Sequence, residues 1–256
     1  MDYWMGGLAP AAFWAAMAIT GFAGFVKGTV GFAMPLIMMG AFSSFLPPET
    51  ALAGLILPTL VTNLAQAFRD GFGAAAHSAW AYRRFLTGTV VFILVSAPFV
   101  RVIPPGVFLM MLGVPITAYA ALQLAGRSLA IRIEHRNRAE WGLGVVGGLY
   151  GGVSGIWGPP LIVYLLSTGV GKDETIRVQG VVFLLGAVVL TAAHLNSGVL
   201  NALSVPFSAA LVLPAVGGML LGFRAGKRLD QTRFRRWTQV LLVLTGLNLI
   251  RRALDL

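Results

Sequence analysis

One positively charged side chain lies in an otherwise uncharged stretch near the start of the chain. Lys27 is the only charged residue between Asp2 and Glu49. If this stretch enters a membrane, the charge costs about 2.5–3.5 kcal/mol on insertion scales, so such a Lys is a candidate site for an anion. The alternative is a loop Lys whose ammonium reaches the membrane surface. We expect Lys27 to supply part of the attraction for a bound anion.

Lys27 belongs to a glycine motif that occurs twice. The segments 24–31 and 151–158 agree at four of eight positions, and prolines follow both of them. A helix broken at such a motif exposes backbone N–H groups and a partially positive helix end, which together suit an anion. The candidate binding residues from the two motifs, besides Lys27, are Gly28, Gly31, Ser154, Gly155, Trp157 and Gly158. For Trp157, packing or support of the helix break is the favoured interpretation.

A third group of candidates forms a polar stripe on the segment 50–68. Thr59, Thr62, Asn63 and Gln66 follow the spacing i, i+3, i+4, i+7, which places them on one face of a helix. This face should contact protein or water. It either lines a path for the anion or makes hydrogen bonds between helices, and the sequence leaves both interpretations open.

Other polar residues stand at or within the later apolar segments. Arg177 and Gln179 lie at the start of the run 178–223, where Arg177 either closes the inner mouth of the path or anchors the helix at the membrane surface. His194 is the one titratable residue inside that run. It is a possible proton carrier, or a His whose ring nitrogens are already hydrogen-bonded.

A catalytic alternative rests on the same residues. The segment 152–155 has the Gly-x-Ser-Gly form of rhomboid proteases, so Ser154 and His194 are a conceivable Ser–His pair. The other half carries Lys27 at the position of Ser154, however, and no acidic or amide side chain is arranged to orient His194. The chain has no cysteine and no HExxH, P-loop or dinucleotide motif. We therefore expect no enzyme, metal or cofactor.

The segments that carry these residues are those of an integral membrane protein. Of 256 residues, 57% are hydrophobic and 11% charged, and the mean hydropathy is +0.81. Six uncharged runs of 19 to 46 residues occur, namely 3–26, 28–48, 50–68, 102–126, 141–171 and 178–223. With the shorter runs 85–100 and 237–250, they predict eight hydrophobic segments, all helical, because a bilayer crossing requires internally bonded backbone.

The basic residues lie mainly between these runs and predict their orientation. If both 3–48 and 141–171 are broken-helix hairpins that enter and leave on one side, the connections on the inner side hold 15 Lys and Arg residues and the other side holds three. Eight plain crossings would give no bias. Each half then has a hairpin plus three helices, about ten passes in all. We predict two inverted membrane repeats, 1–126 and 141–256, joined by a cytoplasmic linker, 127–140.

The glycine motifs, together with the spacing of the hydrophobic segments, resemble the sulfite exporter TauE/SafE family. This resemblance implies a multi-pass transporter in the bacterial cytoplasmic membrane that exports sulfite, sulfoacetate or a related sulfonate. The expected partners are a small anionic substrate and the lipid bilayer, with no nucleic acid despite the formal charge of +10. An anion channel of the same architecture is the alternative, and the sequence leaves open whether the protein is a monomer or a homodimer.

Overall fold

The computed structural model describes residues 5–226 and 229–255, and these form helices without strands. The first half contains α1 (Pro10–Val30), α2 (Met34–Phe42), α3 (Pro48–Ala67), α4 (Phe72–Ala81), α5 (Arg83–Ser96), the 3₁₀ helix η2 (Ala97–Arg101) and α6 (Pro105–Leu124). The second half contains α7 (Arg136–Ser154), α8 (Gly158–Ser167), α9 (Lys172–Asn196), α10 (Ser204–Ala225) and α11 (Gln231–Leu254). The predicted all-helical class is therefore confirmed.

Six helical segments of the described part are long and apolar enough to cross a membrane. They are Pro10–Val30, Pro48–Ala67, Arg83–Arg101, Pro105–Leu124, Glu174–Asn196 and Ser204–Ala225. The helix Gly158–Ser167 is apolar but shorter. The chain is thus a multi-pass membrane protein by the length and composition of its helices.

One helix was not expected. Residues 69–84 read as a connection between hydrophobic runs because charged side chains flank them, yet α4 forms within this segment. Its sequence contains five alanines among ten residues, the type with the highest helix propensity. The linker 127–140 likewise ends in helix, because α7 begins at Arg136.

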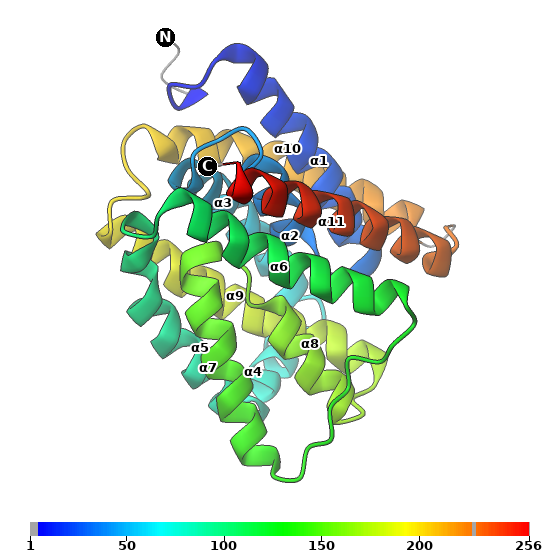
Figure 1. Cartoon of the computed structure of the whole chain (residues 1–256). Coiled ribbons are helices and arrows are strands. Elements are labelled where there is room, and N and C mark those ends of the chain that lie inside the picture. Colours follow the sequence, from blue (N-terminus) through cyan, green and yellow to red (C-terminus); the bar gives the residue numbers. More distant parts are fainter. Residues whose placement is uncertain (1–4, 227–228, 256) are drawn as a thin grey trace.

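Helices from the two halves pack against each other in pairs. Figure 1 shows α1 beside α10, α5 beside α7 and α6 beside α11, and α3 also contacts α9. Each pair joins one helix from the first half with one from the second. The core therefore consists of contacts between helices that lie far apart in the sequence, and it depends on both halves.

Glycines allow these pairs to approach closely. A Cβ at Gly218 on α10 would lie 2.1 Å from the carbonyl oxygen of Gly21 on α1, and one at Gly148 on α7 would lie 2.5 Å from that of Thr89 on α5. Both distances are shorter than any real Cβ contact. Small residues at helix contacts give the van der Waals packing that holds membrane helices together. The many glycines of the sequence thus serve contacts within the chain.

A proline inside α3 is compensated by a neighbouring helix. Pro58 has no N–H, so the carbonyl oxygen of Gly54 loses its helical donor. The hydroxyl of Ser208 on α10 donates to this oxygen at 3.4 Å and accepts from the N–H of Leu57 at 3.2 Å. The exposed backbone groups are therefore satisfied by protein, as the membrane interior requires.

Candidate functional site

The two glycine motifs break their helices beside one cavity. In the first motif α1 ends at Val30 and α2 begins at Met34, while in the second α7 ends at Ser154 and α8 begins at Gly158. Gly31 (φ 86°) and Gly155 (φ 70°) adopt the left-handed conformation that ends a helix. Ala33 also has a positive φ, 79°, which is uncommon for a residue with a side chain. The predicted interruptions therefore occur at both motifs.

This cavity is lined by residues of α1, α3 and α9, by residues at the two helix breaks, and by the first residues of α2 and α8. The centre of a water molecule can occupy about 30 Å³ of it, and all empty space among the lining atoms, including open solvent, is about 390 Å³. The lining residues are Lys27, Phe32, Ala33, Pro35, Leu36, Thr59, Asn63, Gly155, Ile156, Trp157, Gly158, Pro159 and Phe183. Six of the predicted site residues are among them: Lys27, Thr59, Asn63, Gly155, Trp157 and Gly158. The two motifs thus meet in one place.

Lys27 lies on the last turn of α1 and points into the protein rather than to the membrane surface. Its side chain is 2% exposed. The ammonium donates to the hydroxyl of Thr62 at 2.9 Å and to the side-chain oxygen of Asn63. An ammonium has three N–H donors, so one donor remains beyond these two bonds. The alternative of a loop Lys reaching the surface is wrong for this structure.

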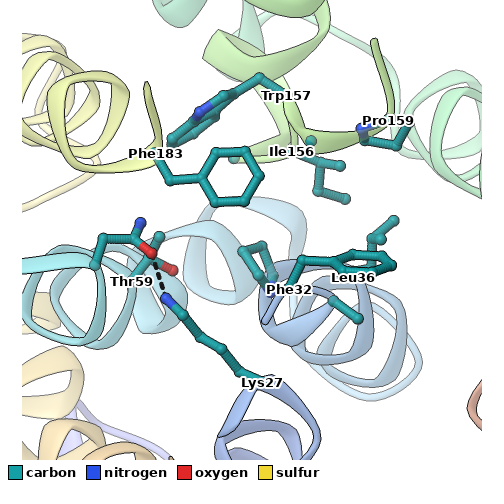
Figure 2. A pocket seen from close by; sticks show the side chains of 13 residues that line it. Lys27, Phe32, Leu36, Thr59, Ile156, Trp157, Pro159 and Phe183 are labelled. Carbon is teal, nitrogen blue, oxygen red and sulfur yellow. Dashed lines mark hydrogen bonds between the residues drawn. The ribbon is translucent and has the colours of Figure 1, made fainter. Parts of the chain in front are cut away.

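The polar stripe of α3 faces Lys27 and the cavity. Thr59 and Thr62 are buried, and the hydroxyl of Thr62 donates to the carbonyl oxygen of Pro58 at 2.6 Å while it accepts from Lys27. The hydroxyl of Thr59, which is 1% exposed, has no hydrogen-bond partner within the described residues. Figure 2 shows Thr59 beside the end of the Lys27 side chain. This hydroxyl is buried without a partner at the edge of the cavity, which makes it a candidate donor to a ligand.

Several other predicted site residues lie outside the cavity lining. Gln66 continues the stripe but donates to the carbonyl oxygen of Ile176 at 3.3 Å, so it links α3 with α9. A Cβ at Gly28 would lie 2.2 Å from the carbonyl oxygen of Met219, so Gly28 serves the contact between α1 and α10. Gly31 ends α1 by donating its N–H to the Lys27 carbonyl at 2.8 Å.

Two predicted site residues at the start of the run 178–223, Arg177 and Gln179, have different surroundings in the structure. Arg177 donates to the hydroxyl of Ser78 at 3.0 Å and forms an ion pair with Asp70 at 3.8 Å, so it ties α9 to the segment around α4. Gln179 is buried near the first break, where its side-chain oxygen lies 3.9 Å from the position of a Cβ on Gly31. Neither side chain lines the cavity.

Ser154 and His194 do not form a Ser–His pair. The hydroxyl of Ser154 donates to the carbonyl oxygen of Tyr150 at 2.6 Å and accepts from the N–H of Ile156 at 3.1 Å. His194 places Nε2 2.9 Å from the carbonyl oxygen of Gly152 and Nδ1 3.2 Å from the hydroxyl of Ser197. Each side chain therefore stabilises a helix end. Nothing in this geometry activates a serine nucleophile.

Trp157 lines the cavity, and its indole packs against two glycines. Cβ atoms at Gly151 on α7 and Gly186 on α9 would lie 3.0 Å and 2.7 Å from the indole ring. The indole also meets the Phe183 ring edge to face, with centroids 6.3 Å apart. Its N–H has no hydrogen-bond partner within the described residues and lies against Gly186 rather than beside Lys27.

Sequence reasoning missed the apolar part of the lining. Ile156 and Phe183 form the wall above Lys27 in Figure 2, and Phe32 and Leu36 stand at its side. Apolar side chains are common in every run of this chain, so no signal in the sequence separates the cavity wall from residues that face lipid. The proline after each motif was the available sign that neighbouring residues leave the helix.

Comparison with known protein families agrees with the resemblance seen in the glycine motifs. The family model for the sulfite exporter TauE/SafE family matches residues 16–249. No curated protein and no solved structure matches the chain. The match covers most of the sequence, including both glycine motifs, α3 and α9, and confirms the resemblance found in the motifs. The chain therefore belongs to the sulfite exporter TauE/SafE family of membrane transporters and is not an enzyme.

Proposed function

We propose that this protein exports a small sulfur-containing anion, such as sulfite, sulfoacetate or a related sulfonate, across the cytoplasmic membrane of a bacterium. The anion binds in the cavity between the two helix breaks, next to Lys27. The family supports a sulfur anion as substrate. The position of the cavity, beside Lys27 and both helix breaks, supports it as the binding site.

The burial of Lys27 without a counter-ion carries this proposal. Lys27 takes part in none of the ion pairs between side chains that the structure describes, and its two hydrogen-bond partners are neutral. A buried charge is costly unless an opposite charge compensates it. An anion in the adjoining cavity would provide this compensation. The third ammonium N–H and the unpaired hydroxyl of Thr59 would then donate to it.

The burial of Lys27 and its neighbours favours a carrier over a channel. Lys27, Thr59 and Trp157 are each at most 2% exposed, whereas Phe32, Pro35 and Gly158 of the lining are partly exposed. A carrier binds its substrate at a buried site that opens to one side at a time, whereas conduction through a channel needs a continuous open path. Because the inside of the membrane is negative, the potential drives each exported negative charge by about 2.3 kcal/mol per 100 mV.

We further infer that the two halves are inverted repeats with about ten passes. The Lys and Arg distribution supports the inversion, and the packing pairs support two equivalent halves, because exchanging the halves maps one pair onto another: α1 with α10 becomes α7 with α5, and α3 with α10 becomes α9 with α5. The pairs α3 with α9 and α6 with α11 map onto themselves. In transporters built from such repeats, broken helices of both halves meet at a central site.

A transport assay with one matched control tests the proposal. Proteoliposomes loaded with sulfite, sulfoacetate, sulfate or acetate are assayed for counterflow with the wild type, Lys27→Met and Arg224→Met. Arg224 is an exposed cation at the end of α10, so its variant removes the same charge away from the cavity. We expect sulfur anions to exchange in the wild type and Arg224→Met and at least tenfold more slowly in Lys27→Met. Equal flux in all three proteins would refute the site.

A further inference from the structure

The cavity has one polar end and one apolar wall. Lys27, Thr59 and Asn63 lie together at the polar end. Figure 2 shows Phe183, Trp157 and Ile156 on the side opposite Lys27. These three side chains are at most 9% exposed, so the wall is part of the protein core. A ligand that touches Lys27 therefore presents its other end to apolar groups.

The second helix break adds few donors to this wall. The N–H of Gly155 donates to the carbonyl oxygen of Gly151 at 2.7 Å, and the N–H of Ile156 donates to the hydroxyl of Ser154. Pro159 and Pro160 occupy the first turn of α8 and have no N–H to offer. The start of α8, from the N-cap Trp157 to Pro160, thus lacks two of the four amides that make a helix terminus attractive to an anion.

The charge of the lining is also limited to one residue. Among the residues that line the cavity, Lys27 is the only one with a charged side chain. A second negative charge on the ligand would face the apolar wall without a partner, and burying an unpaired charge is strongly unfavourable.

These observations narrow the substrate class. The geometry points to a singly charged organic anion, with a sulfonate-like head at Lys27 and a compact hydrocarbon body against Ile156, Trp157 and Phe183. Simple alkanesulfonates have this form, whereas sulfoacetate carries a second charge. This inference rests on the proposed function, because it requires the anion to bind at Lys27.

The decisive experiment compares two ligands of nearly the same shape. In 2-methylpropane-1-sulfonate a branched alkyl group replaces the carboxylate of sulfoacetate. Isothermal titration of the purified full chain should give a dissociation constant at least tenfold lower for the alkyl compound. From methanesulfonate to ethanesulfonate to propanesulfonate, each CH₂ should tighten binding about fourfold, the value for burying one CH₂.

Two variants test whether the apolar wall causes the preference for the alkyl sulfonate. Phe183→Leu removes part of the wall and should weaken binding of the branched sulfonate several-fold while methanesulfonate changes less. Phe72→Leu is the matched control, since Phe72 is 75% exposed on α4. A several-fold loss in Phe183→Leu alone supports the inference, whereas equal binding by both variants and the wild type would overturn it.

Lys27→Met separates this inference from the proposed function. If sulfoacetate binds at least as tightly as the alkyl compound and both weaken in Lys27→Met, the preference for apolar monoanions is wrong and the site at Lys27 stands. If no sulfonate binds, or all bind equally to the wild type and Lys27→Met, the proposed function fails and this inference fails with it.

Discussion

Replacing Asn63 by Asp should block the site with an internal counter-ion. Asn63 lies on α3 and accepts a hydrogen bond from the ammonium of Lys27. Asn63→Asp keeps the shape of the side chain and places a carboxylate in contact with this ammonium. The charge of Lys27 is then compensated without a ligand, so the empty site becomes stable and the anion loses its partner.

The size of the effect follows from the contact. Two unit charges about 4 Å apart interact by about 4 kcal/mol at an effective dielectric constant of 20. A bound anion would have to displace this pair and would also meet the new negative charge. Since about 1.4 kcal/mol corresponds to a factor of ten, we expect anion affinity to fall by about 100- to 1000-fold.

The matched control is Asn248→Asp on α11. Asn248 accepts a hydrogen bond from the guanidinium of Arg251 at 3.3 Å, so this variant also places a carboxylate beside a cation, but away from the cavity. Titration with methanesulfonate and thermal unfolding in detergent are measured for both. Unchanged affinity in Asn63→Asp, with the fold intact, would refute the reasoning that the anion compensates Lys27.

Three further predictions address packing, pH and topology. Gly218→Ala should lower the melting temperature by several degrees, because overpacking costs about 1–3 kcal/mol. Gly217→Ala is the control and should not lower it, because no atom lies within 4 Å of a Cβ at Gly217. Equal melting temperatures of the two variants would contradict the close contact of α1 and α10. Burial, followed by the neighbouring Glu174 carboxylate, raises the pKa of Tyr82. The folded protein therefore holds this proton more tightly, and stability should fall as the pH rises above about 10, a loss that Tyr82→Phe should reduce in melts across alkaline pH. In a chain without cysteine, a membrane-impermeant maleimide added outside cells should label Val102→Cys but not Ala130→Cys, and the opposite pattern would contradict the inverted topology.

The sequence was most informative where backbone chemistry is local. Glycine and proline set the allowed conformations of their own neighbourhood, so both helix breaks were predictable from the two motifs. Lys27 was recognisable because a charge inside an apolar run needs a partner. The stripe of α3 was recognisable from its helical spacing, and the structure places Thr62 and Asn63 of this stripe against Lys27.

Other features depend on tertiary contacts that no local pattern records. The apolar wall at Ile156 and Phe183 has the same composition as surfaces that face lipid, so only packing distinguishes it. Gly28 looked like a ligand-binding glycine because of its motif, yet the face it occupies is covered by α10. Helix α4 lies between charged residues, which made its alanine-rich segment look like a loop.

The central claim is that the ammonium of Lys27 holds the transported anion. Isothermal titration of the purified wild type, Lys27→Met and Lys27→Arg with sulfite and methanesulfonate tests it most directly. Losing a hydrogen bond to a charged group costs about 1.5–3 kcal/mol, so Lys27→Met should raise the dissociation constant about 10- to 150-fold. Lys27→Arg should retain more affinity because it keeps the charge. Equal dissociation constants for the wild type and Lys27→Met would contradict the claim.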